Sequence, residues 1–108
     1  MKETTYIALL EQEIQVRISF VRERSQILAF VVQLEYFYQN KWYPVVRYDT
    51  AHQFAHCDIL YPDGRQEKHP LDVNNYNEAL TYAQNDILKN YQRYCTRFKD
   101  WLNESRSY

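Results

Sequence analysis

Glycine is almost absent from this sequence: one residue in 108. Loops that bind the phosphates of nucleotides need several glycines at fixed spacing, so neither a P-loop nor a dinucleotide-binding loop can exist here. No apolar run approaches the length of a transmembrane helix, and we expect no membrane partner. The first 13 residues become charged after a short apolar stretch, unlike a secretory signal, so the expected location is the cytoplasm.

The sequence also has few cysteines and no excess of one charge. Cys57 and Cys95 have neither metal-site spacing nor the pattern of a disulfide framework. We expect both to be small buried hydrophobes. The chain has 13 basic and 14 acidic residues, for a net charge of −1. No segment is basic enough to indicate nucleic-acid binding by charge alone.

Tyrosine is what the sequence has in abundance, with 11 residues. Its apolar ring and polar tip suit half-buried sheet surfaces and interfaces. The apolar fraction of 45% and the charged fraction of 25% are those of an ordinary globular protein. We find no internal repeat and no linker, so residues 1–108 are expected to form one domain.

The first third of the chain predicts one short helix followed by two strands. Thr4 or Thr5 could cap a helix that ends near Glu13. From residue 14 to residue 20 apolar and polar residues alternate, which predicts a half-buried strand. After a charged turn, residues 28–38 form the strongest strand pattern, with its even-numbered residues on the apolar face.

The third predicted strand covers residues 43–49, and its register can be inferred from charge. Placing Glu35 opposite Arg47 pairs opposite charges across the two strands. The same register places Gln33 opposite Asp49 and leaves a three-residue hairpin loop. Arg47 and Asp49 then share the sheet face that points away from the helix expected at the C-terminus.

The second half predicts a hairpin and a long helix. After a loop over residues 50–55, residues 56–61 form a strand that ends at Pro62-Asp63-Gly64, a strong turn signal. Residues 65–71 can form a short return strand. Asn75 and Glu78 fit a capping box at the start of a helix that runs to about residue 102. The helix has one apolar stripe, made of Leu80, Ala83, Ile87, Tyr91, Tyr94, Phe98 and Trp101.

The expected fold is therefore α+β, with three to five antiparallel strands packed against one long C-terminal helix and a short N-terminal helix. One face of such a sheet stays uncovered. Self-association into a homo-oligomer is expected, through that face or through an edge strand.

One segment, residues 47–58, gathers residue types that carry chemistry. Asp49, His52, His56 and Asp58 offer two imidazoles and two carboxylates, which suit zinc or another transition metal if a metal is bound. Without a metal, the same segment could perform acid–base chemistry, as in RNA cleavage. One histidine would accept a proton, the other would donate one, and Arg47 would hold the phosphate.

Two further interpretations of this segment remain open. It could be an anion-binding patch without catalysis. Separately, Tyr48, Asp58 and Glu35 are expected to take part in binding. It could also be structural, because Asp and His after a strand often cap turns, and Arg47 already has Glu35 as an expected partner. No cofactor is expected.

The letters VVRYDTAHQFAHCD, the PDG turn and the long helix resemble a family of small uncharacterised prokaryotic proteins from about residue 30 to the helix end. Somewhat similar Arg-Tyr-Asp and paired-His segments occur in small proteins encoded in toxin–antitoxin loci. That resemblance implies either RNA or a cognate protein as the partner.

Two hypotheses for the function follow. The first is a nuclease-like or toxin-like enzyme in which His52, His56, Asp49 and Arg47 converge on an open pocket. The second is a non-catalytic interaction protein, such as an antitoxin, subunit or adaptor, with the histidines apart or buried. The separation of the two histidines distinguishes the two hypotheses.

Overall fold

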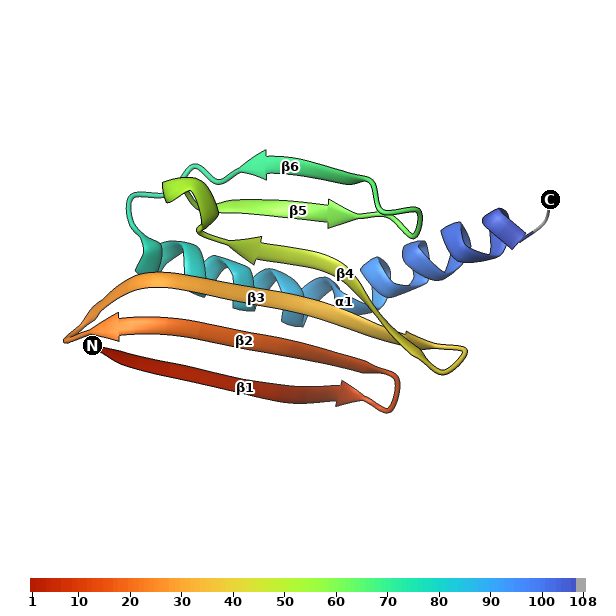
Figure 1. The fold of residues 1–108 in the computed structure, drawn as a ribbon, viewed down its shortest axis with the longest axis horizontal. Helices are drawn as coiled ribbons and strands as arrows, with labels where there is room; N and C mark the ends of the chain where they lie inside the picture. Colours follow the sequence, from red (N-terminus) through yellow and green to blue (C-terminus); the bar gives the residue numbers. More distant parts are fainter. Residues whose placement is uncertain (107–108) are drawn as a thin grey trace.

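The computed structural model describes residues 1–106, which form one antiparallel sheet and one long helix (Figure 1). The elements are β1 (Lys2–Glu11), β2 (Ile14–Glu23), β3 (Gln26–Tyr38), β4 (Lys41–Asp49), β5 (His56–Leu60), β6 (Gln66–Pro70) and α1 (Tyr76–Arg106), with a 3₁₀ turn η1 (Ala51–Gln53) between β4 and β5. The α+β class is confirmed. The six strands in the described residues exceed the expected three to five.

The strands pair in the order of the sequence, β1 to β6, and α1 lies across one face of the sheet (Figure 1). The even-numbered residues of β3 meet the apolar stripe of the helix, as predicted. The largest fully buried apolar side chains are Val32, Leu34, Val45, Val46, Ile87 and Phe98. Each such side chain contributes about 1.5–3 kcal/mol relative to an exposed one, so this layer is the main source of stability.

The expected N-terminal helix is wrong, because these residues form strand β1. Tyr6 pairs with Ile18 and Ala8 pairs with Val16 across to β2. A cap and a few apolar residues do not decide between helix and strand. The aromatic and aliphatic residues of this segment gain more from packing beside the apolar side chains of β2 than from an isolated helical turn.

The predicted register of β3 and β4 is also wrong, by two residues at Arg47. Tyr38 pairs with Lys41, so the loop holds only Gln39 and Asn40, both in the left-handed region with φ of 50° and 64°. That geometry belongs to a two-residue hairpin turn. Val45 then forms a bulge, which moves the register by one residue. A displacement of two residues preserves which side chains share a face.

The remaining elements follow the sequence closely. Gly64, with φ of 93°, closes the turn after β5 by donating its N–H to the Tyr61 carbonyl at 3.0 Å. Asn75 caps α1 by accepting the Glu78 N–H at 2.9 Å, while the Glu78 carboxylate accepts the N–H of Asn74. The helix continues beyond the expected end, to Arg106. Within residues 1–106, no helix combines the length and apolar character that a membrane span requires.

Candidate functional site

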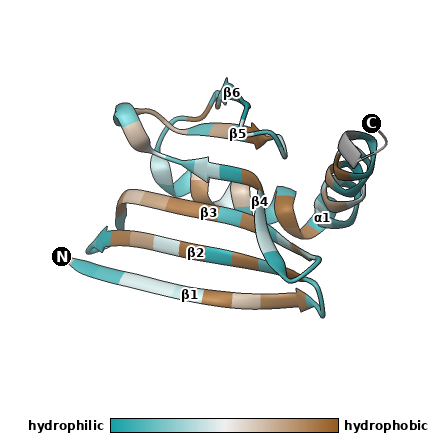
Figure 2. Cartoon of the chain, turned by 45° about the vertical axis from the view of Figure 1, so that its right-hand side comes forward, coloured by the Kyte–Doolittle hydropathy of each residue, from teal (hydrophilic) through white to brown (hydrophobic). Residues whose placement is uncertain are grey.

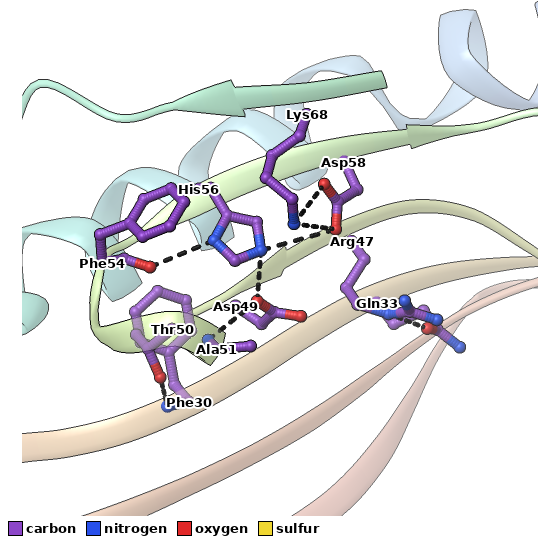
Figure 3. A network of polar contacts seen from close by, with 10 residues as sticks. All are labelled: Phe30, Gln33, Arg47, Asp49, Thr50, Ala51, Phe54, His56, Asp58 and Lys68. Atoms are coloured by element: carbon purple, nitrogen blue, oxygen red, sulfur yellow. Dashed lines mark hydrogen bonds and ion pairs between the residues drawn. The ribbon is translucent and has the colours of Figure 1, made fainter. Parts of the chain in front are cut away.

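Four polar side chains meet on the sheet face opposite α1, where the end of β4 lies beside β5 and β5 lies beside β6 (Figure 3). Asp49 of β4 lies opposite His56 of β5, and Asp58 of β5 lies opposite Lys68 of β6. We call Asp49, His56, Asp58 and Lys68 the His56 cluster. Its position follows from the period of two in three adjacent strands, which aims all four side chains at the same face.

The cluster is compact, His56 and Asp58 are almost fully buried, and Asp49 is mostly buried. The Nε2 atom of His56 lies 2.6 Å from Oδ1 of Asp49 and 3.5 Å from Oδ2 of Asp58. The Lys68 ammonium lies 3.2 Å from Oδ1 of Asp58. His56 is 0% exposed and Asp58 is 2% exposed, although they lie on the face that the helix leaves open. The burial of two carboxylates here is costly unless cations offset their charge.

The segment between β4 and β5 folds back over this cluster and covers it (Figure 3). The Phe54 ring lies against the His56 imidazole, with centroids 4.9 Å apart. Asp49 accepts the N–H of Ala51 at 3.1 Å, and the Thr50 hydroxyl accepts the N–H of Phe30 at 3.1 Å. These two bonds fix the start of η1 over the sheet.

The second hydrogen bond of His56 sets its tautomer. Nδ1 lies 3.1 Å from the carbonyl oxygen of Phe54, and a carbonyl can only accept. Nδ1 therefore carries a proton, and Nε2 is the atom that faces the carboxylates of Asp49 and Asp58. Despite the short distance to Asp49, Nε2 has no hydrogen bond of acceptable direction.

His52 does not join the cluster. It lies exposed in η1, with φ of 66°, and no hydrogen bond or ion pair involves its side chain within residues 1–106. The two histidines of the segment therefore occupy different environments: His56 is buried among carboxylates and His52 faces solvent.

Arg47 and Glu35 belong to a second polar network on the same face, and the expected direct pair between them is not formed. Arg47 donates to Gln33 at 2.7 Å, and Gln33 donates to Glu35 at 2.6 Å. Glu35 also accepts from Gln15 and Arg17 of β2. Burial opposes the ionisation of Glu35 and is the largest single influence, but the hydrogen bonds from its three neighbours together hold its pKa below the usual value.

One family model matches residues 1–104 and describes a domain of unknown function, DUF7718. The chain belongs to the DUF7718 family. The expected membership of an uncharacterised family is thereby confirmed. No curated protein and no solved structure matches the chain.

Tyr48 occupies the opposite face of this DUF7718 domain, beneath α1. It donates to the Asp86 carboxylate at 2.6 Å, and Asp86 also accepts from Tyr94 at 2.7 Å and from Asn90 at 2.8 Å. Burial, followed by the bond to Asp86, raises the pKa of Tyr48 far above its usual range. Cys57 lies on the same side, and burial raises its pKa to about 11.

The structure thus brings together three of the candidate residues of the DUF7718 domain: Asp49, His56 and Asp58. Two residues of these polar groups, Lys68 and Asp86, were not predicted from the sequence. Lys68 lies opposite Asp58 in the hairpin around the Pro62-Asp63-Gly64 turn. This pairing could have been found from the sequence, since the hairpin itself was predicted. Asp86 gave no such signal, because an acidic residue on a long helix is usually on the solvent side.

Chemically, the His56 cluster offers one imidazole nitrogen and two carboxylates that converge on a buried point. Such a set can hold a transition-metal ion or a proton. A general acid or base must lie within hydrogen-bond reach of its substrate, and the burial of His56 leaves no room for one in this conformation.

Proposed function

We propose that this protein is a non-catalytic interaction module that assembles as a homodimer through strand β1. The observation that carries the proposal is the character of β1: an edge strand whose side chains are apolar on both faces of the sheet. Natural proteins normally protect such an edge with charge, proline or a covering element, because its unpaired backbone groups attract another strand.

The central stretch of β1, residues 4–10, has no charged side chain. Ile7 is 49% exposed and Leu9 is 67% exposed on the face opposite α1, while Tyr6 is 43% exposed on the helix side. Figure 2 shows the hydrophobic colouring of the second half of this strand. A long, uncharged edge of this kind is what strand addition by another chain requires.

A hollow beside β1 adds to this surface. It has a volume of about 350 Å³ and lies between β1, β2 and the helix. Tyr6, Ala8 and Leu10 line it from the strand, and Leu88 from α1. The helix packs over the middle of the sheet and leaves the inner side of β1 half covered, so a partner that extends the sheet would also cover apolar side chains here.

A second copy of the chain is the partner that the sequence of β1 fits. Two antiparallel copies related by a two-fold axis at Ile7 would place Tyr6 opposite Ala8, Thr5 opposite Leu9 and Thr4 opposite Leu10. Each pair joins a larger residue to a smaller or β-branched one, and the stretch has no charge. Beyond it, Glu3 would lie opposite Glu11, so the favourable pairing is that of residues 4–10. The interface is then the same patch on both subunits, as two-fold symmetry demands.

The rest of the candidate site supports a non-catalytic role. Arg47 and Asp49 are engaged by neighbours, and His56 is buried while His52 is exposed. This is the arrangement expected of an interaction protein, whereas an enzyme of the kind considered above needs converging side chains in an open pocket.

The test is the mass of the wild-type protein in solution compared with that of Ile7→Lys. At the two-fold axis, the substitution sets two ammonium groups opposite each other, which opposes pairing. The matched control is His69→Lys, which places the same charge on β6, the opposite edge. We expect wild type and His69→Lys to sediment as dimers and Ile7→Lys as a monomer with an unchanged melting temperature. A monomeric wild type would refute the homodimer, and a cognate protein would become the partner to seek.

RNA cleavage of the toxin–antitoxin type is the second proposal. Its supporting observation is that His52 is exposed and holds a left-handed backbone conformation, which non-glycine residues adopt at a cost and often at functional sites. Because the His52 side chain has no partner within residues 1–106, His52→Ala should fold as wild type does. Loss of RNA cleavage in this variant would support the proposal, and absence of cleavage by wild type would end it.

A further inference from the structure

The geometry points to a divalent transition-metal site formed by Asp49, His56 and Asp58, independent of the β1 interface. One ligand atom from each residue lies within 4.8 Å of the other two. An imidazole nitrogen with two carboxylates is a donor set typical of zinc and of manganese or iron in the divalent state.

The imidazole of His56 is oriented as a metal ligand is. Its Nδ1–H donates to the Phe54 carbonyl, which holds the ring in place and leaves Nε2 to bind. In the neutral ring, the Nε2 lone pair is directed toward two carboxylates, an arrangement that is repulsive unless a cation lies between them. The side chain is 1% exposed, so solvent does not screen this repulsion.

The direction of Nε2 distinguishes a metal ion from a proton. A proton on Nε2 would need an oxygen along the N–H bond, yet Nε2 has no aligned acceptor although Asp49 lies 2.6 Å away. A metal ion does not require that alignment, because it is placed between its ligands. The unsatisfied, fully buried nitrogen is thus explained by an ion at the centre of the cluster.

Charge leads to the same conclusion. Asp49 and Asp58 contribute two negative charges, and Lys68 contributes one positive charge. Arg47 lies opposite Asp58 on β4 but donates to Gln33, and within residues 1–106 His56 is the only basic group that pairs with the Asp49 carboxylate. A carboxylate charge without a cation is unfavourable at a buried position. A divalent ion offsets both carboxylates, and Lys68, with a side chain 41% exposed, can then turn toward solvent.

The two distances from Nε2 of His56 need only a small adjustment. Ligands bound tetrahedrally at 2.0–2.1 Å are about 3.3 Å apart, which the 3.5 Å between His56 Nε2 and Asp58 nearly matches. The Asp49 oxygen must retreat by about 0.7 Å to reach the same spacing. Its side chain is 13% exposed and lies beside the start of η1, where it can turn. The fourth position would be open to water or an added ligand.

Such an ion would tie β4 to β5, and through β5 the hairpin that ends in β6. It would act as a structural clamp on β4, β5 and β6. The expected effect is on stability rather than on catalysis, so the site can be tested without knowing the protein's activity.

The experiment begins with protein dialysed against EDTA and titrated with ZnCl₂ by calorimetry and by thermal melting. We expect one ion per chain and a melting temperature that rises by about 10 °C when free zinc exceeds the dissociation constant a hundredfold. Asp58→Asn and Asp49→Asn should each lose the calorimetric signal and the rise. The matched control is His69→Ala, because His69 and Glu67 form an exposed pair at 2.8 Å that could bind zinc without a built site.

A Co²⁺ titration identifies the ligands even if one variant fails to fold. Nitrogen and oxygen ligands give visible bands without the intense near-ultraviolet absorption of a cobalt–thiolate bond. Absence of binding to wild type would overturn the proposal. Binding lost in His69→Ala but kept in Asp58→Asn and Asp49→Asn, or a strong thiolate band from Cys57, would overturn it as well.

Discussion

Glu35 accepts a 2.6 Å hydrogen bond from Gln15, its cross-strand partner on β2. Arg17 and Gln33 complete the set of donors around the same carboxylate. The three strands β2, β3 and β4 are therefore linked by polar side chains on the face that α1 leaves open, and the charge of Glu35 holds the network together.

This network makes stability depend on pH. The pKa of Glu35 is lower in the folded state than its ordinary value of 4.5, so its contribution is complete above pH 4.5 and is lost as the pH falls through the lower, folded-state pKa. We measure the free energy of unfolding in urea at pH 6 and at pH 3. The decrease between pH 6 and pH 3 should be smaller for Glu35→Gln than for wild type. Equal losses in the two proteins would contradict the assignment.

Tyr48 and Asp86 anchor the other face of β4 to the helix. Tyr48→Phe removes a donor to a half-buried carboxylate, and hydrogen bonds to charged groups are worth about 1.5–3 kcal/mol. We expect the free energy of unfolding to fall by about that amount. Tyr82→Phe is the matched control, since Tyr82 is 53% exposed and contacts the same ring. A comparable loss in the control would show that removing either hydroxyl is costly, and would contradict a specific contribution from the bond between Tyr48 and Asp86.

The two cysteines should resist alkylation in the folded protein. Burial raises the pKa of Cys57 to about 11 and that of Cys95 to about 12. At pH 8 nearly all of each thiol is protonated, and only the thiolate reacts. Iodoacetamide should modify both slowly in native buffer and quickly in 6 M urea, as followed by mass spectrometry. Rapid modification of Cys95 in native buffer would contradict this prediction, and would mean that the C-terminal part of α1 separates from the sheet.

The faces of the sheet were predictable although the register was not. Two features were not predicted from the sequence. One is the left-handed pair Gln39-Asn40, which lacks the usual Asn-Gly turn signal, and the other is the bulge at Val45. Together they displaced Arg47 by two residues. Because side chains alternate with a period of two, Arg47 and Asp49 still face away from the helix.

Membership of the candidate site was predictable in part, but its burial was not. The sequence placed Asp49, His56 and Asp58 in one group because they lie close together along the chain. Their enclosure depends on η1, where His52 and Gln53 both adopt positive φ to fold over the sheet. No local pattern predicts such a loop, since only a few per cent of non-glycine residues adopt positive φ.

The N-terminal segment shows the limit of local signals. Residues 4–10 contain a cap residue and apolar residues that suit a short helix, and only their pairing with β2 makes them a strand. The same pairing creates the exposed edge on which the proposed homodimer depends.

The most direct test of the homodimer is oxidation of Ile7→Cys. In an antiparallel pair centred on Ile7, the two Cα atoms would lie about 4.5–5.5 Å apart, within the range of a disulfide. We predict a covalent dimer on mild oxidation of this variant and none for His69→Cys on the opposite edge. Failure of Ile7→Cys to cross-link, or equal cross-linking of the two variants, would contradict pairing through β1.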